Sequence, residues 1–414
     1  MMLGKWSRRL AGVLLLAYAG FLVFGIATDE AAFQPDFRVY YYAARAWEEG
    51  LNPYDPDSLS RVAQSPVQHR YVYPVLALVP FRFIPPLSYR DAYRLFLAVK
   101  CLILVGLLCL WRKILGPSHR AVFYAFCLLA FNGSLYLDFR SGNVSVIEQG
   151  ALWLSFLFFA RGNLFPFCLL VLLGSSFKIT PLLFLLLLWS TSDRKRHWYF
   201  FGSVACFLVV HGALFLIDTT LFRAFVQNVR QFDEMGIVNP STVTFLNSLS
   251  TLIAGTTGYG VPPAVRWALF AGIVIAIVVA SSRAYLAARR LPHDEQVWQA
   301  VFLACFVYAL ILPRFKDYSF ILLLVPAFSV IKRASPASAQ IPLVVLAVLS
   351  AHYVHLPLLR DVLDVVWDYY PLALAYLFWG MQIRELVSRH LTTPREAANV
   401  ENALRPECEP GHLS

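Results

Sequence analysis

The sequence predicts an all-α protein, a bundle of helices that crosses a membrane many times. Of the 414 residues, 58% are hydrophobic and only 14% are charged, whereas a soluble domain usually carries about 25% charged residues. The apolar residues lie in blocks, such as 102–111, 182–189 and 269–280. These blocks extend to the length of about 20 residues that a helix needs to cross a bilayer, so we expect about 11–13 membrane helices, counting short re-entrant ones.

The distribution of charge is typical of a membrane protein rather than of a nucleic-acid-binding protein. The net charge is +10, but the basic residues lie at the ends of apolar segments and form no stripe. Six of the seven cysteines lie inside apolar segments without a CxxC pair, and we interpret them as small core residues. The sequence therefore predicts the lipid bilayer as its environment, with no nucleic acid partner, no metal site and no cofactor.

The first apolar segment, about 10–27, follows Lys5, Arg8 and Arg9 and has no clear cleavage site. It is predicted to be a first span with a cytoplasmic N-terminus, because basic residues favour the cytoplasmic side. The loop 28–74 is then extracytoplasmic, and we expect an interfacial helix within it. Residues 75–86 are apolar but too short to cross a membrane, and we predict that they are re-entrant or interfacial.

The later spans are predicted from apolar length and from the alternation of basic ends: 91–111, 121–137, 145–160, 198–217, 263–283, 297–312, 319–331, 340–356 and 367–384. The segment 164–190 has basic residues beyond both of its ends. It is interpreted as one span or as two half-helices that meet near Lys178, and two half-helices would keep this lysine out of the middle of the bilayer. Residues 218–262 are predicted to be a second long outer loop.

The chain is predicted to have one transmembrane domain, residues 1–390, and a disordered cytoplasmic tail, residues 391–414. Both termini are then cytoplasmic. The outer side collects most of the acidic residues and most of the polar interruptions of the apolar pattern, so we expect the binding or catalytic site there.

Asp36, in the first outer loop, is the first candidate for chemistry. It precedes a predicted helix, 37–49, in which the aromatic run 40–42 is expected to lie at the membrane interface. A structural role as the N-cap of that helix is one interpretation. A general base that reaches a lipid headgroup is the other.

The motifs around Asp36 resemble those of glycosyltransferase family 87. Residues 36–44 read DFRVYYYAA, residues 50–56 read GLNPYDP, and residues 71–74 read YVYP, where the family has a second proline at Val75. Further matches follow in order: Gly142-Asn143, KITP at 178–181, and Asn247-Ser248. The resemblance covers roughly residues 10–335. It departs from the family at 313–318, which lacks the usual tryptophan and paired histidines.

The resemblance implies a fold of the GT-C type and an inverting transfer of a sugar, most often mannose, from a polyprenyl phosphate. The acceptor would be a lipid-linked or polymeric glycan on the extracytoplasmic side of the plasma membrane. Such a transfer needs a general base, because the attacking hydroxyl must lose a proton. The position that matches the family's general base is Asp36. We expect the remaining candidates to contact the donor phosphate or the substrates: Lys178, Arg314, Lys316, Arg140, Asn143, Tyr40, Tyr73 and Asn247.

Structural interpretations of several polar residues remain open. Lys178 could extend to the interface, and Arg314, Lys316 and Asp317 could form a surface ion cluster. Asp138 and Arg140 could be an ion pair of a loop. The alternative function is a transporter or flippase of lipid-linked sugars, but a transporter typically shows internal repeats, and none is visible.

Overall fold

The computed structural model describes residues 34–67, 69–230, 236–335, 337–349 and 365–403, together with seven isolated positions before residue 34. For 390–403 it describes the backbone alone. The described residues form helices and no β-strand, which confirms the all-α fold class. Most of the predicted span 10–27 and most of the late outer loop after 349 lie outside the described residues.

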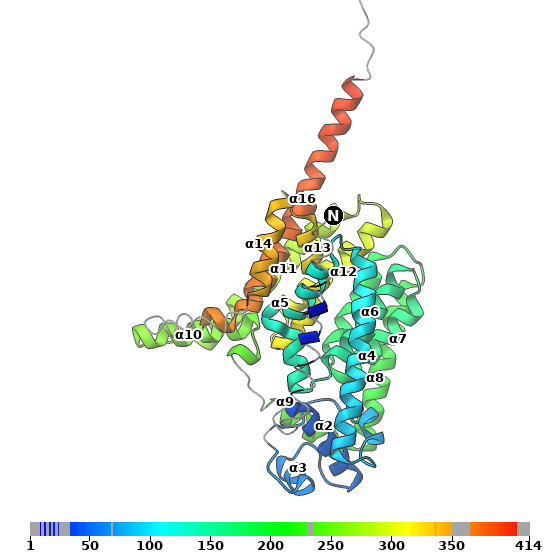
Figure 1. Ribbon diagram of the computed structural model, residues 1–414, viewed down its shortest axis with the longest axis vertical. Helices are drawn as coiled ribbons and strands as arrows, with labels where there is room; N and C mark the ends of the chain where they lie inside the picture. Colours follow the sequence, from blue (N-terminus) through cyan, green and yellow to red (C-terminus); the bar gives the residue numbers. More distant parts are fainter. Residues whose placement is uncertain are drawn as a thin grey trace, which may run out of the picture.

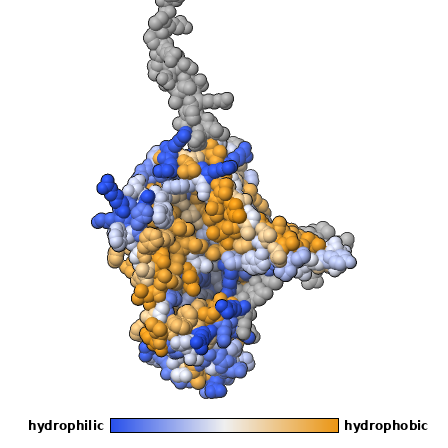
Figure 2. Space-filling view, turned by 180° about the vertical axis from the view of Figure 1, so that it is seen from behind, coloured by the Kyte–Doolittle hydropathy of each residue, from blue (hydrophilic) through white to orange (hydrophobic). Residues whose placement is uncertain are grey.

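Five of the described helices are long and apolar enough to cross a membrane: α4 (Tyr89–Leu115), α5 (Arg120–Ser141), α8 (Arg196–Ile217), α11 (Pro263–Ala288) and α12 (His293–Ile311). Hydrophobic residues cover the middle of the molecule, and hydrophilic residues gather toward its two ends (Figure 2). A bundle with several membrane spans is therefore confirmed, while the count of 11–13 stays a prediction. Shorter apolar helices complete the bundle: α6 (Ser145–Ala160), α7 (Leu164–Phe177) and η3 (Thr180–Ser190).

The segment 164–190 is broken in two, as one of the two interpretations predicted. Helix α7 ends at Phe177, and Lys178 adopts an extended conformation, with φ −140° and ψ 133°. The element η3 then begins, with Pro181 in its first turn. Proline is tolerated there because the backbone N–H that it lacks would have no partner within the helix. The two halves pack against each other, so Lys178 lies at the bend between them.

The segment 218–262, which is predicted to be a second long outer loop, is largely helical. It contains α9 (Thr219–Arg230), η4 (Gly236–Val238) and α10 (Thr242–Thr257), and α10 projects sideways from the bundle (Figure 1). Ser241 and Thr244 form a capping box, in which each side chain bonds to the backbone of the other. This arrangement satisfies the free N–H groups at a helix start and fixes where α10 begins.

The C-terminal part of the chain is also more helical than expected. The predicted span 319–331 consists of η5 (Asp317–Leu323) and α13 (Leu324–Arg333), and it is almost wholly buried. The elements η6 (Ala337–Ala339) and α14 (Gln340–Val348) follow. Helix α16 (Tyr370–Ala403) continues into the segment for which a disordered tail was predicted, because the alanines and glutamates of 396–403 favour helix.

The first outer loop folds into a small helical cap at the end of the bundle opposite the free end of α16 (Figure 1). It contains α2 (Pro35–Glu48), α3 (Pro56–Ala63), η1 (Val75–Leu78) and η2 (Pro80–Phe83), so 75–86 does form only short turns. The apolar side of α2 packs on the bundle, and Phe37 stacks on Phe96 of α4 with ring centres 4.7 Å apart. Tyr40 and Tyr41 are therefore buried, and the predicted position at a membrane interface is wrong for them.

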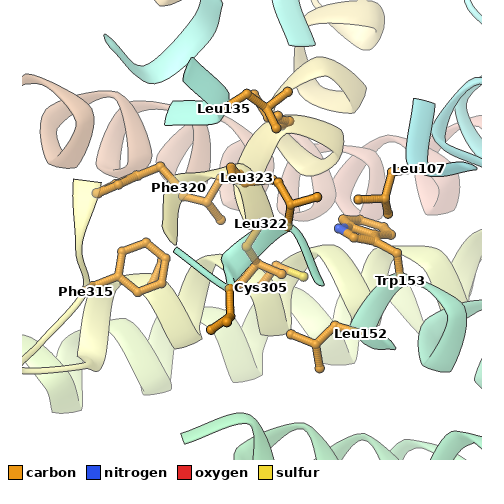
Figure 3. Packing of buried hydrophobic residues seen from close by; sticks show 14 of the residues in the cluster. Leu107, Leu135, Leu152, Trp153, Cys305, Phe315, Phe320, Leu322 and Leu323 are labelled. Atoms are coloured by element: carbon orange, nitrogen blue, oxygen red, sulfur yellow. The ribbon is translucent and has the colours of Figure 1, made fainter. Parts of the chain in front are cut away.

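A packed aromatic core lies behind this cap. Phe315 and Phe320 meet edge to face at 4.8 Å (Figure 3). Phe320 also stacks on Phe131 of α5 at 5.7 Å. Phe131 lies where α5 is interrupted by non-helical residues, 130–133. Edge-to-face and offset stacking are the favoured geometries of aromatic pairs. The core therefore gives the loop that carries Arg314 and Lys316 a rigid base.

Candidate active site

The C-terminal end of α5 and the start of α2 approach each other closely. Gly142 has a φ of +71°, and a Cβ atom there would lie 2.5 Å from Cβ of Gln34. Only glycine fits such a position without strain. The amide of Gln34 donates to the carbonyl of Arg140 at 2.6 Å, which ties the two segments together. As a result, Asp36 in the first turn of α2 lies beside Asn143, the residue after Gly142.

Asn143 is the centre of a buried polar network. Its side-chain nitrogen lies 2.9 Å from a carboxylate oxygen of Asp36, and 3.1, 2.7 and 3.0 Å from the hydroxyls of Tyr40, Tyr73 and Tyr318. An amide has two hydrogens to donate, so the phenol hydrogens must complete the network. Asp36 does not cap α2, and the N-cap interpretation is wrong, because Gln34 occupies that position.

The two phenols of the first outer loop stay protonated at neutral pH. Burial raises the pKa of Tyr40 well above its usual value, and the neighbouring Tyr73 and Asp36 raise it further. Burial also raises the pKa of Tyr73. Both hydroxyls therefore remain neutral beside the carboxylate of Asp36.

Lys178 joins the same network from the other side. Its ammonium nitrogen lies 2.8 Å from the carboxylate of Glu148 and 2.9 Å from the hydroxyl of Ser145. Ser145 in turn donates to the side-chain oxygen of Asn143 at 3.0 Å, which turns the amide nitrogen of Asn143 toward Asp36. The interface interpretation of Lys178 is therefore incomplete. About a quarter of the side chain is exposed, but its charge is paired with Glu148.

Two cavities meet at this network. The first, of about 250 Å³, is lined by Asp36, Tyr40, His69, Arg70 and Arg140, among others. The second, of about 210 Å³, is lined by Lys178 and by apolar side chains from α7 and α9. Both cavities share the same wall, whose members are Val72, Tyr73, Arg314, Lys316 and Tyr318.

The loop 313–318 supplies the cations of that shared wall. The backbone amide of Phe315 donates to Asn239 at 2.9 Å, and its side chain is 3% exposed. Because side chains alternate along an extended segment, Arg314 and Lys316 are directed away from the core, and both line the two cavities. The ammonium group of Lys316 lies 5.6 Å from the ring centre of Tyr318. The late loop thus places two cations beside the network.

A second ion pair lies directly behind the Gly142–Asn143 turn. Lys100 and Asp138 are fully buried and pair at 2.8 Å. Lys100 also donates to the carbonyl of Asp138 at 2.7 Å, and that carbonyl accepts the backbone amides of Gly142 and Asn143. The interpretation of Asp138 with Arg140 as a loop ion pair is therefore wrong. Arg140 instead donates to the hydroxyl of Tyr136 at 2.9 Å.

The structure brings Asp36 together with seven of the eight predicted binding residues. Asn247 is the exception, because it lies in a different cavity and accepts a hydrogen bond from Arg266. The sequence analysis missed Tyr318, Ser145 and Lys100. An ionisable residue inside an apolar helix is a signal of function, and it could have identified Lys100. Among the described residues, no group of three or more histidine, cysteine, aspartate or glutamate side chains could hold a metal ion.

Comparison with protein families defines the class of this membrane protein. Residues 71–313, more than half of the chain, match the family model described as Glycosyltransferase family 87. The protein is a membrane glycosyltransferase. The chain belongs to glycosyltransferase family 87, as the resemblance of its motifs predicted. The match includes Asn143 and Lys178, and it begins after Asp36. No curated protein and no solved structure shows significant similarity to the chain.

Proposed function

We propose that the protein transfers a hexose, mannose, from a polyprenyl phosphate to a lipid-linked or polymeric glycan with inversion at the anomeric carbon. The observation that carries the proposal is the continuous polar network from Asp36 through Asn143 and Ser145 to Lys178. It joins a carboxylate in one cavity to a cation in the adjoining cavity. A glycosyl transfer from a phosphate needs both groups, at opposite sides of the sugar.

In this proposal the acceptor occupies the first cavity and Asp36 is the general base. The acceptor hydroxyl attacks the anomeric carbon and gives its proton to the carboxylate of Asp36. The bond from the anomeric carbon to the phosphate oxygen breaks at the same time, and the electron pair leaves with the phosphate. Positioned proton transfer of this kind contributes about 10²–10⁴-fold to a rate. Donors from Asn143 orient the carboxylate for that role.

The polyprenyl phosphate would leave into the second cavity. Lys178 lies in its wall, and Arg314 and Lys316 border it. Fixed cations stabilise the charge that develops on a leaving phosphate. The other side of this cavity is apolar, with Phe177, Phe225 and others. A cation beside apolar walls suits a phosphate that carries a hydrocarbon chain better than it suits a water-soluble nucleotide.

Charge distribution supports an extracytoplasmic position of the active site. Basic residues gather at the end of the bundle where α4 and α13 finish, and Lys332 donates there to the carbonyl of Leu115. The Asp36 network lies at the other end, near the start of α4. Basic ends favour the cytoplasm. We therefore propose a plasma membrane location with both termini cytoplasmic and the site on the outer face.

A transporter or flippase of lipid-linked sugars is the second candidate, and one observation favours it. The break at Lys178 is a discontinuous helix, a feature that transporters use to bind substrates. The two functions differ in their products, because only a transferase releases free polyprenyl phosphate and extends the acceptor.

The donor class is tested in proteoliposomes with purified protein and a glycan acceptor. We expect labelled mannose to pass to the acceptor from polyprenyl-phosphate mannose and not from nucleotide-linked mannose. The released lipid should be polyprenyl phosphate in amounts equal to the extended product. Movement of the intact lipid across the bilayer without bond cleavage would instead support the flippase.

The role of Lys178 is tested by the double substitution Lys178→Gln with Glu148→Gln. Removing both partners leaves no buried unpaired carboxylate, so the fold should persist. We expect transfer to fall about 10²–10³-fold, the usual effect of removing one charge-stabilising group. Lys195→Gln, in the exposed basic segment before α8, is the matched control. A double variant with control-level activity would remove Lys178 from the mechanism.

A further inference from the structure

A third cavity lies between α10 and the start of α11, apart from the two cavities of the active site. It has a volume of about 340 Å³ and shares no lining residue with them. The residues that line it are Val243, Leu246, Asn247, Thr251, Arg266, Trp267 and Phe270. It therefore combines one ionisable side chain, two smaller polar ones and an apolar wall.

The polar atoms of this cavity are arranged to donate hydrogen bonds. Arg266 donates from one terminal nitrogen to the side-chain oxygen of Asn247 at 2.6 Å. That bond uses the amide oxygen of Asn247 and leaves its NH₂ group as a donor. The Nε atom of Arg266 is buried and has no hydrogen-bond partner among the described residues. A ligand that fits these groups must offer acceptor oxygens.

The charge of Arg266 points to an anion. Arg266 is the only ionisable residue in the lining, and it forms no ion pair with a carboxylate of the described residues. It occupies the first turn of α11, which begins at Pro263. The helix dipole is positive there and disfavours a cation, whereas it favours a bound anion. An anionic group in the cavity would therefore be stabilised by both the guanidinium and the helix.

The position of the cavity points to the membrane interface. Helix α10 extends across the long axis of the bundle, and its upper side in the view from behind is hydrophobic (Figures 1 and 2). Trp267, which lines the cavity, is 57% exposed, and Tyr259, in the connection between α10 and α11, is 83% exposed. Large exposed aromatic side chains are enriched at the depth of lipid headgroups. Trp267 and Phe270 give the cavity an apolar side that acyl chains or glycerol can contact.

We propose that this cavity binds the phosphate of a membrane phospholipid, with Arg266 and Asn247 as its ligands and α10 as the helix that rests on the bilayer. The site is distinct from the active site and does not depend on the proposed transfer reaction. Ser241 at the start of α10 donates to the carbonyl of Pro313 at 2.7 Å. The phospholipid would therefore belong to the leaflet at the same end of the bundle as Asp36.

The test uses the full chain in detergent, with native mass spectrometry to count bound lipid. The probes are phosphatidylglycerol and diacylglycerol. Diacylglycerol serves as the matched lipid that lacks a phosphate. We expect the wild-type protein to retain phosphatidylglycerol and not diacylglycerol. Arg266→Gln removes the positive charge of the site. Asn247→Asp introduces a carboxylate, which competes with the phosphate for the guanidinium and repels the phosphate. Each should weaken binding by roughly tenfold or more, the usual effect of losing a charged hydrogen bond.

Arg283→Gln is the matched control, because Arg283 is an exposed arginine at the other end of the same helix. It should retain phosphatidylglycerol as the wild type does. The proposal would be overturned if the Arg266 and Asn247 variants bound phosphatidylglycerol as well as the wild type does. It would also be overturned if the wild type retained diacylglycerol as well as phosphatidylglycerol. Displacement of phosphatidylglycerol by inorganic phosphate at similar concentration would also overturn it, because the ligand would then be a soluble anion.

Discussion

Asp36→Asn should reduce sugar transfer by orders of magnitude while leaving the protein folded. Asparagine has nearly the shape of aspartate, and its amide can still bond to Asn143 and the surrounding tyrosines, so the cap and the bundle should persist. It cannot accept the proton of the acceptor hydroxyl at neutral pH. We expect the transfer rate from a polyprenyl-phosphate sugar to fall about 10²–10⁴-fold. The measurement is initial rate in proteoliposomes, with thermal unfolding in detergent as the check on folding.

Glu49→Gln provides the matched control for this substitution. Glu49 directly follows the same helix, and its carboxylate is about half exposed and pairs with Arg45. Removal of the Glu49 carboxylate should leave the transfer rate unchanged. An Asp36→Asn protein with the activity of the control would contradict the assignment of Asp36 as the base. An unfolded Asp36→Asn protein would show that the carboxylate serves the fold.

Lys100→Met should produce the largest loss of stability among the substitutions considered. The side chains are similar in length, but the change leaves the carboxylate of Asp138 buried and without its cation. Breaking a buried ion pair from one side costs about 3–5 kcal/mol. The carbonyl of Asp138 also loses a donor, which loosens the turn that holds Asn143. Thermal or denaturant unfolding in detergent measures the effect.

The double variant Lys100→Met with Asp138→Asn separates the charge from the packing. It removes both charges, and replacing both partners of a buried pair is often nearly neutral. We expect most of the lost stability to return, with a lower transfer rate because the turn at Asn143 still lacks the lysine donor. A double variant as unstable as Lys100→Met would mean that the methionine disturbs the packing and that the ion pair contributes little.

Much of the architecture could be predicted because it depends on local signals. Apolar length predicted the long spans, and the basic residues on both sides of 164–190 indicated the break at Lys178. Asp36 was identified from motifs of the family. Asn143 was also named, but its central role could not be predicted. That role depends on residues 70 or more positions apart meeting at one atom, and no local pattern encodes such a meeting.

The failures have equally specific causes. Tyr40 and Tyr41 were assigned to a membrane interface because aromatic rings favour it, but the apolar face of α2 had a nearer partner in Phe96 and Tyr89. Asn247 was placed in the active site by a weak motif, and the sideways course of α10 moves it to another cavity. Lys100 was overlooked because its partner, Asp138, lies on another helix, 38 residues away.

The most direct test of the account is an experimental structure of the protein with a non-hydrolysable polyprenyl-phosphate sugar bound. We expect the phosphate within hydrogen-bond distance of Lys178 and between Arg314 and Lys316, with the polyprenyl chain leaving along the apolar wall of the second cavity. The anomeric carbon should then lie beside Tyr73 and Tyr318, in the wall that both cavities share, and should face Asp36. A donor bound with its phosphate away from Lys178, or with its sugar directed away from Asp36, would contradict the proposed active site.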